Sequence, residues 1–188
     1  MSKLTCGSLF CALALLLCGW PTSVSAQELI WHVKAVHPDG RLLDVKALDR
    51  DGTRYDVKAI ERDGNAHVLD VKALVKGQQW PVKVLLSDDQ YAPVKAIGPG
   101  GVIYDIKALT PEGTRLDVKG VRRRGSILDI KAIAADGTFY GVKAVSRDGH
   151  LYDVKGLKMN ADRKEGTVEG VDIEAHIKAL PQVPDRRE

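Results

Sequence analysis

Apolar and polar residues alternate along most of the chain, in a short pattern that returns about every twelve residues. Around the centre of one copy, the apolar residues Leu43, Val45 and Ala47 alternate with Asp44 and Lys46. A period of two with a β-branched residue at its centre is typical of a β-strand with one buried face. A Gly or Pro arrives every few residues, and no apolar stripe of helical period survives. The pattern therefore predicts one strand per unit.

A valine or isoleucine precedes a lysine in every copy of the unit. Eight of the ten intervals between the first eleven of these lysines are twelve residues, and the other two are fourteen and eleven. These lysines are Lys34, Lys46, Lys58, Lys72, Lys83, Lys95, Lys107, Lys119, Lys131, Lys143 and Lys155, and a twelfth copy contains Lys178. The repeat predicts an all-β domain of about twelve short antiparallel strands, arranged as a meander rolled into a barrel or a strongly twisted sheet.

Glycine ends a four-residue turn between most of the predicted strands. The segments 37–40, 49–52, 98–101 and 122–125 all have this form. It is typical of a type I turn followed by a glycine bulge, which is a common hairpin connection. These turns predict the register of each hairpin.

In the first hairpin, the turn places Lys34 opposite Asp44 and Val33 opposite Val45. The same rule at the next turn places Lys46 opposite an aspartate. One face of the sheet would carry valine ladders beside alanine, and the other a chequerboard of lysine and aspartate.

The length of the repeat conflicts with a flat meander. Nine residues, from Arg41 to Asp49, separate successive glycine-bulge turns. Backbone N–H and C=O groups point to alternate edges along a strand. With an odd count, the groups at the two turns point to the same edge, whereas a flat meander needs its two hairpins on opposite edges. A bulge in each strand, wider alternate turns or a solenoid-like coil would each resolve this conflict.

The first 26 residues have the three parts of a signal peptide: a basic start at Lys3, an apolar run, and small residues at 24–26. We expect residues 1–26 to be removed, residues 27–180 to form a single β-repeat domain, and residues 181–188 to form a flexible tail. The expected destination is the periplasm or the cell surface and exterior, with no transmembrane segment after cleavage.

Composition excludes several classes of function for the predicted mature domain. Without Lys3, the chain has 27 basic and 25 acidic residues. This near-neutral balance is unlike the strongly basic surface of most nucleic-acid-binding proteins. All three cysteines lie within residues 1–26, which excludes cysteine catalysis and cysteine–zinc sites. The histidines and serines show no catalytic spacing. We expect no catalytic residue, no metal and no cofactor.

Two consecutive repeats depart from the pattern and supply the candidate binding residues. Pro81 and Pro93 stand where most copies have aspartate, and proline cannot donate a ladder hydrogen bond. Lys83 and Lys95 lose their in-strand acid, and Tyr91 falls on the same face. These three residues are candidates for an anionic or sugar ligand. The alternative is a sheet edge blunted by proline and lysine.

Other departures give weaker candidates. His32 and His176 replace aspartate in the first and last copies. They could form a metal-binding or pH-sensitive seam where the chain ends meet. Alternatively, they are polar residues on edge strands. Arg122, Arg123 and Arg124 form a basic turn tip that would contact phosphate, lipopolysaccharide or an acidic partner, or would simply be solvated.

The array of YDVKAI and LDVKAL units joined by Asp-Gly turns resembles an uncharacterised group of secreted bacterial proteins built from short VKA-containing repeats. The resemblance covers residues 31–180. It implies export and a repeat fold, and it carries no activity.

The function that these features favour is a non-enzymatic binding or structural module of the periplasm or cell surface. Its partner would be an unknown protein, a glycan or an anionic surface, because repeat arrays give extended surfaces more readily than one deep pocket. One alternative is a β-barrel that carries a small ligand. The other is an outer-membrane β-barrel with the Asp/Lys face inside, for which the strands are short.

Overall fold

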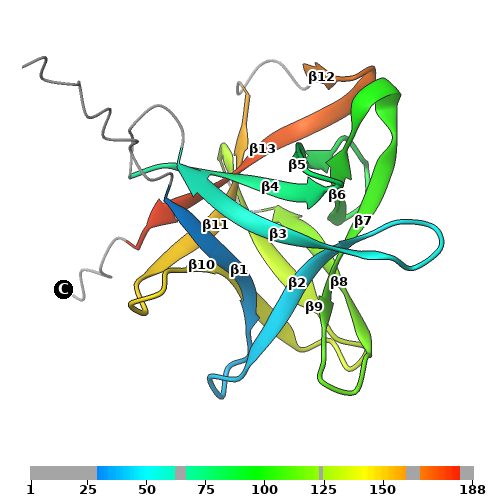
Figure 1. The fold of residues 1–188 in the computed structure, drawn as a ribbon. Coiled ribbons are helices and arrows are strands. Elements are labelled where there is room, and N and C mark those ends of the chain that lie inside the picture. Colours follow the sequence, from blue (N-terminus) through cyan, green and yellow to red (C-terminus); the bar gives the residue numbers. More distant parts are fainter. Residues whose placement is uncertain (1–28, 62–66, 123–124, 160–165, 183–188) are drawn as a thin grey trace, which may run out of the picture.

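The structure is an antiparallel β-barrel that twelve strands close, with a thirteenth, three-residue strand outside it (Figure 1). The computed structural model describes residues 29–61, 67–122, 125–159 and 166–182. The predicted signal peptide and most of the predicted tail lie outside these residues. The predicted all-β fold of about twelve antiparallel strands is confirmed.

Each repeat forms one strand, as its alternating pattern predicts. The strands are β1 (Ile30–Val36), β2 (Leu42–Leu48), β3 (Arg54–Glu61), β4 (Leu69–Val75), β5 (Gln78–Leu85), β6 (Tyr91–Ile97), β7 (Ile103–Leu109), β8 (Arg115–Arg122), β9 (Ile127–Ile133), β10 (Phe139–Val145), β11 (Leu151–Lys158), β12 (Gly166–Val168) and β13 (Val171–Pro181). A short 3₁₀ turn, η1 (Pro99–Gly101), lies between β6 and β7.

A single strand, β2, shows how the barrel is built. Its first half pairs with β1 and its second half pairs with β3, both along the same edge. Its other edge pairs with β7 over Asp44–Leu48. Because β1 and β3 also pair with each other, these three strands enclose a triangle, seen in Figure 1. We call such a group a triplet.

Four triplets account for all twelve barrel strands. They are β1, β2 and β3; β4, β5 and β13; β6, β7 and β8; and β9, β10 and β11. Every triplet joins each of the other three through one further strand pair: β1–β10, β2–β7, β3–β4, β5–β6, β8–β9 and β11–β13. The pairing network thus has the connectivity of a tetrahedron, and each barrel strand has partners along both edges.

The odd count between turns explains this arrangement. Arg41 and Asp49 both have odd numbers, so their backbone groups point to the same edge of β2, and both hairpins must form there. The hydrogen bonds from His37 N to Arg41 O, at 2.9 Å, and from Asp49 N to Thr53 O, at 3.2 Å, close the two turns. The opposite edge of the strand is left for a distant strand. The conflict with a flat meander is resolved by placing both hairpins on one edge.

In the first hairpin, the predicted register is correct next to the turn and wrong away from it. Lys34 lies opposite Asp44, as predicted. Val33 does not face Val45, because β1 and β2 separate after this pair, and Val33 instead faces Ala144 of β10. The separation follows from the third strand of the triplet, which takes over the pairing.

The turn predicted at 122–125 also differs. A glycine-bulge turn of that form would place Arg122 opposite Ser126, whereas Arg122 faces Leu128. This connection joins two different triplets, and β8 pairs with β9 over Asp117–Arg122 and Leu128–Ile133. Residues 123 and 124 lie outside the described part of the chain.

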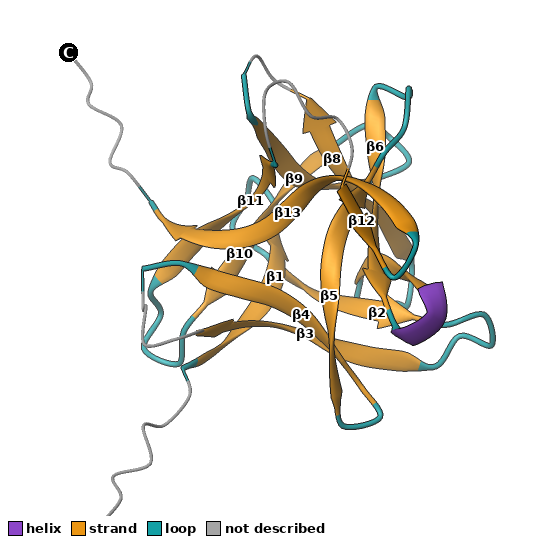
Figure 2. Cartoon of the chain, turned by 90° about the horizontal axis from the view of Figure 1, so that it is seen from above, coloured by secondary structure: helices purple, strands orange, loops and turns teal. Residues whose placement is uncertain are grey.

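The inward face of the strands carries the valines and alanines, which form one hydrophobic core. Figure 2 shows from above how the strands are arranged around this interior. Three central positions depart from alanine. Val84 of β5 is fully buried where most other copies have alanine, and Gly120 and Gly156 replace alanine in β8 and β11. A Cβ atom added to Gly120 would lie 3.0 Å from Val84 Cγ1, and one added to Gly156 would lie 3.3 Å from Val84 Cγ2. Val84 therefore fills space beside both glycines, together with Leu128, whose Cβ would lie 3.2 Å from the Cβ added to Gly156.

We expect Gly120→Ala to destabilise the fold by about 1–3 kcal/mol, because the new methyl group overpacks against Val84. Val84→Ala should also destabilise, by about 1–3 kcal/mol, because it leaves a cavity. The triple variant V84A/G120A/G156A restores alanine at all three positions, so its loss should be clearly smaller than the sum of the single losses. Chemical denaturation of the wild type, the three single variants and the triple variant tests this, and additive losses would contradict the proposed compensation.

Candidate functional site: four rings of lysine and aspartate

The outer face of each triplet gathers the lysines and aspartates of its three strands into a ring. In every strand pair within a triplet, the lysine of one strand lies opposite the aspartate position of the other, as Lys34 lies opposite Asp44. Three such pairs close a circle of six positions where the strands separate. The ring is therefore a direct product of the repeat and of triplet closure.

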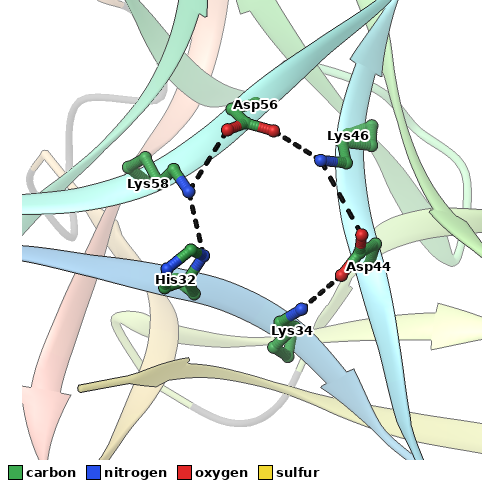
Figure 3. A network of polar contacts seen from close by, with 6 residues as sticks. All are labelled: His32, Lys34, Asp44, Lys46, Asp56 and Lys58. Carbon is green, nitrogen blue, oxygen red and sulfur yellow. Dashed lines mark hydrogen bonds and ion pairs between the residues drawn. The ribbon is translucent and has the colours of Figure 1, made fainter. Parts of the chain in front are cut away.

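The first ring belongs to β1, β2 and β3, and Figure 3 shows it. Its members are His32, Lys34, Asp44, Lys46, Asp56 and Lys58. Lys46 contacts two carboxylates, that of Asp56 and that of Asp44, where the Nζ to Oδ2 distance is 3.7 Å. Lys58 lies 3.2 Å from Asp56 and 2.9 Å from His32 Nδ1.

These contacts shift the titration of the ring. A hydrogen bond from Lys34 holds the pKa of Asp44 below its ordinary value, and one from Lys46 does the same for Asp56. The pKa of His32 is also lowered, first by burial and then by the charge of Lys58. The carboxylates therefore stay ionised at neutral pH while the imidazole is uncharged.

The other three rings follow the same plan with different departures. The second consists of Asp70, Lys72, Pro81, Lys83, His176 and Lys178. The third consists of Pro93, Lys95, Asp105, Lys107, Asp117 and Lys119. The fourth consists of Asp129, Lys131, Gly141, Lys143, Asp153 and Lys155. Every ring has three lysines; the second has one aspartate, and the others have two each.

The structure separates the three residues predicted to share a ligand. Lys83 and Lys95 lie opposite each other on β5 and β6 but belong to different rings. Lys95 recovers an acid from the next strand, because its Nζ donates to Asp105. Lys83 Nζ contacts Nδ1 of His176 in the second ring.

Tyr91 lies at the start of β6, opposite Val121. Its ring centroid is 6.0 Å from that of Phe139, at an interplanar angle of 58°. It thus packs toward β10 of another triplet, four residues along the strand from Lys95.

Pro81 and Pro93 shorten the ladder that joins their strands. The β5–β6 pairing has three register pairs, from Val82 to Val84, whereas the other five connections between triplets have five to seven. Each proline lies just beyond one end of this ladder, where its missing N–H would have pointed toward the partner strand. The alternative of a sheet edge blunted by proline and lysine is wrong, because β5 and β6 each have partners along both edges.

His32 and His176 do not form a seam together, because they lie in the first and second rings. Burial and the nearby Lys83 lower the pKa of His176, in that order. Among the described residues, no group of three or more His, Cys, Asp or Glu side chains is placed to hold a metal ion.

Arg122 is the last residue of β8 and is engaged in contacts at several points. Its guanidinium binds the carboxylate of Glu174 with distances of 3.2 Å from Nε and 2.9 Å from Nη2. It also donates to the backbone oxygens of Ser87 and Asp89, in the connection from β5 to β6. Lys158 lies 3.2 Å from the same carboxylate. Arg123 and Arg124 lie outside the described residues.

Glu174 owes its position to an irregularity that the sequence did not reveal. The register between β13 and β5 shifts between Ile173 and Ala175, so Glu174 is the extra residue of a β-bulge. A bulge re-aims a side chain, and here it places a buried carboxylate under Arg122.

A groove of about 600 Å³ lies on the outside of the barrel, between two turns. It is lined by residues 49–51 of the β2–β3 turn and by residues 100–104 around the start of β7. Tyr104 stacks on Tyr55, with centroids 5.6 Å apart, and also packs 4.8 Å from Trp80. Both faces of Tyr104 are thus engaged within the protein.

Comparison with known proteins adds a family and no activity. A family model described as "Family of unknown function (DUF7486)" matches residues 27–180. The chain belongs to this family. No curated protein and no solved structure matches it. In the described residues, no helix is both long enough and apolar enough to cross a membrane.

Acid should destabilise this family member in two steps. The pKa values of His32 and His176 lie below 6.5, so as the pH falls through 6.5 the unfolded chain takes up protons first. The carboxyl pKa values of Asp44 and Asp56 lie below 3.8, so a second loss follows as the pH falls toward and through that value. Urea denaturation across this pH range measures both losses.

The double variant H32Q/H176Q is the control for the first step and should lose it while keeping the second. A wild-type stability that rises as the pH falls from neutral would contradict the assignment.

Removing the Arg122 side chain should leave the buried Glu174 carboxylate with Lys158 as its remaining charged partner among the contacts described above. We expect Arg122→Met to reduce the free energy of unfolding by about 1–3 kcal/mol. R122M/E174M should recover part of this loss, because both charges are then removed. Arg147→Met, at an exposed turn, is the control and should change stability by less than about 0.5 kcal/mol. Equal effects of the two single arginine variants would contradict a structural role for Arg122.

Proposed function

We propose that the chain is an exported, non-enzymatic β-repeat protein that acts as a binding or structural module of the periplasm or cell surface. The observation that carries this proposal is the outward placement of the lysine–aspartate rings on a closed, apolar-cored barrel. The polar residues of the repeat lie on the outer surface, in the same arrangement in each triplet, and are not gathered in one cleft. A rigid surface of this kind suits recognition by charge.

Export is supported by the sequence of residues 1–26, with its basic start, apolar run and small residues before Gln27. The absence of cysteine after residue 26 means that the mature fold needs no disulfide, so its stability must come from burial and backbone pairing.

The carrier alternative is favoured by one observation, the groove of about 600 Å³ between the two turns. This volume is within the range of small-molecule sites. The groove lies outside the barrel, whereas central residues such as Ala47 and Ala108 are fully buried in the core. A carried ligand would therefore bind on the surface.

The outer-membrane alternative requires the Asp/Lys face inside and an apolar face outside. The structure has the reverse arrangement: Val45 and Val57 are buried, while the carboxylate side chains of Asp44 and Asp56 are 49% and 45% exposed. This placement favours the periplasmic or surface module.

Expression of the full chain in a Gram-negative host, followed by fractionation, tests the export proposal. The protein should be recovered from the periplasm or medium without detergent, and its amino terminus should begin at Gln27. Replacing the apolar run at 12–17 by charged residues is the control and should retain the protein inside the cell. Cytoplasmic recovery of the wild-type chain with residues 1–26 intact would overturn the proposal.

A further inference from the structure

The second ring is the most positively charged of the four. It has three lysines and the aspartate Asp70, with Pro81 and His176 at the other two acid positions. With the imidazole neutral, three positive charges against one negative charge leave an excess of two. Each of the other rings has three lysines and two aspartates, which leaves an excess of one.

The lysine neighbours of each ring do not change this comparison. Across the six connections between triplets, lysine always faces lysine, as Lys58 faces Lys72 and Lys155 faces Lys178. Each ring therefore has three such neighbours. The difference between the rings lies in the acid positions alone.

The single carboxylate of the second ring is shared. Lys178 Nζ donates to Asp70 Oδ1, and Lys72 Nζ lies 3.6 Å from Oδ2 of the same group. The Asp70 side chain is 11% exposed, whereas those of Lys72 and Lys178 are 20% and 29% exposed. The acid thus lies beneath the ammonium groups, and the lysines are the part of the ring that a ligand reaches from outside.

Lys83 completes the set from the third strand. Its ammonium contacts Nδ1 of His176, which accepts a hydrogen bond only when that nitrogen carries no proton. The imidazole therefore orients Lys83 without neutralising it. The three lysines of the ring thus come from the three strands of one triplet.

We propose that the second ring binds a phosphate dianion, either as free phosphate or as a phosphate monoester group. A dianion matches the excess of two charges, and the three lysines of the ring supply ammonium donors for charge-assisted hydrogen bonds to phosphate oxygens. This inference rests on the proposed binding role and names its ligand class. Lys83 is shared with the site predicted from the sequence, while Lys95 and Tyr91 belong elsewhere.

Titration calorimetry with inorganic phosphate at neutral pH and low salt tests the proposal. The wild-type protein should bind one phosphate saturably. Lys83→Met should weaken binding about tenfold or more, because one charge-assisted hydrogen bond is lost. Lys46→Met removes the corresponding lysine from the first ring and is the matched control, with an expected change of less than about twofold.

Pro81→Asp gives a sharper test, because it adds the missing acid opposite Lys72 and makes the ring like the other three. It should weaken phosphate binding about tenfold or more while the fold is kept. His176→Asp adds the other missing acid and serves if P81D does not fold. Absence of saturable binding to the wild type, or equal weakening in K46M and K83M, would overturn the proposal.

Vesicle cosedimentation identifies the source of the phosphate. Binding to vesicles that contain phosphatidic acid, a monoester, but not to vesicles with phosphatidylglycerol, a diester, assigns the site to a membrane-borne monoester. Phosphate binding without cosedimentation assigns it to a soluble phosphate compound, and both results support the dianion site. Failure to bind phosphate overturns this inference alone, whereas cytoplasmic recovery in the fractionation experiment overturns the export proposal.

Discussion

The architecture depends on one constraint, the odd number of residues between successive turns. Because Arg41 and Asp49 direct their backbone groups to the same side, both hairpins of β2 form on one edge. A strand of seven residues cannot pair fully with two partners on one edge, so each partner takes half of it. The two partners then meet each other and close a triplet.

The opposite edge remains available for a strand from another triplet, and four triplets joined in this way leave each barrel strand paired on both sides. An open sheet edge, which is a template for aggregation, is thereby removed from the barrel.

The same geometry creates an electrostatic problem that the aspartates solve. Every connection between triplets places lysine directly opposite lysine, as at Lys34 and Lys143 or Lys46 and Lys107. Like charges facing each other across a ladder are unfavourable. Each of these lysines turns toward the aspartate position of its own ring instead, and Lys46 reaches two carboxylates there. A single exposed ion pair contributes less than about 1 kcal/mol. The aspartates matter chiefly because, without them, twelve lysines on one barrel would face each other uncompensated.

The sequence predicts the local half of this structure and misses the long-range half. Alternation and glycine turns are local signals, so the strands and the Lys34–Asp44 pairing follow from them. The departure of Val33 from Val45 depends on β3, which takes over this edge of β1, and Val33 then faces Ala144, more than a hundred residues away; no local pattern encodes either pairing. The surroundings of the candidate residues were missed for the same reason: Lys95 lacks an acid in its own strand but receives Asp105 from the next one. Arg122 looked like part of a turn tip because the bulge at Glu174 cannot be read from the repeat.

The position of the second ring in the chain bears on its departures from the repeat. It belongs to the triplet that is not continuous in sequence, since β13 joins β4 and β5 only after all the other barrel strands have been made. Closure of the barrel therefore depends on the pairing of β13 with β4 and β5.

If the rings served folding alone, the ring that holds the last strand would gain most from a full set of acids. It has the fewest, with proline and histidine at two of its three acid positions. Removing the partners that would steady the last strand is a cost to folding, and such costs persist where a surface has another use. The excess charge of the second ring is thus better explained by a ligand than by the fold.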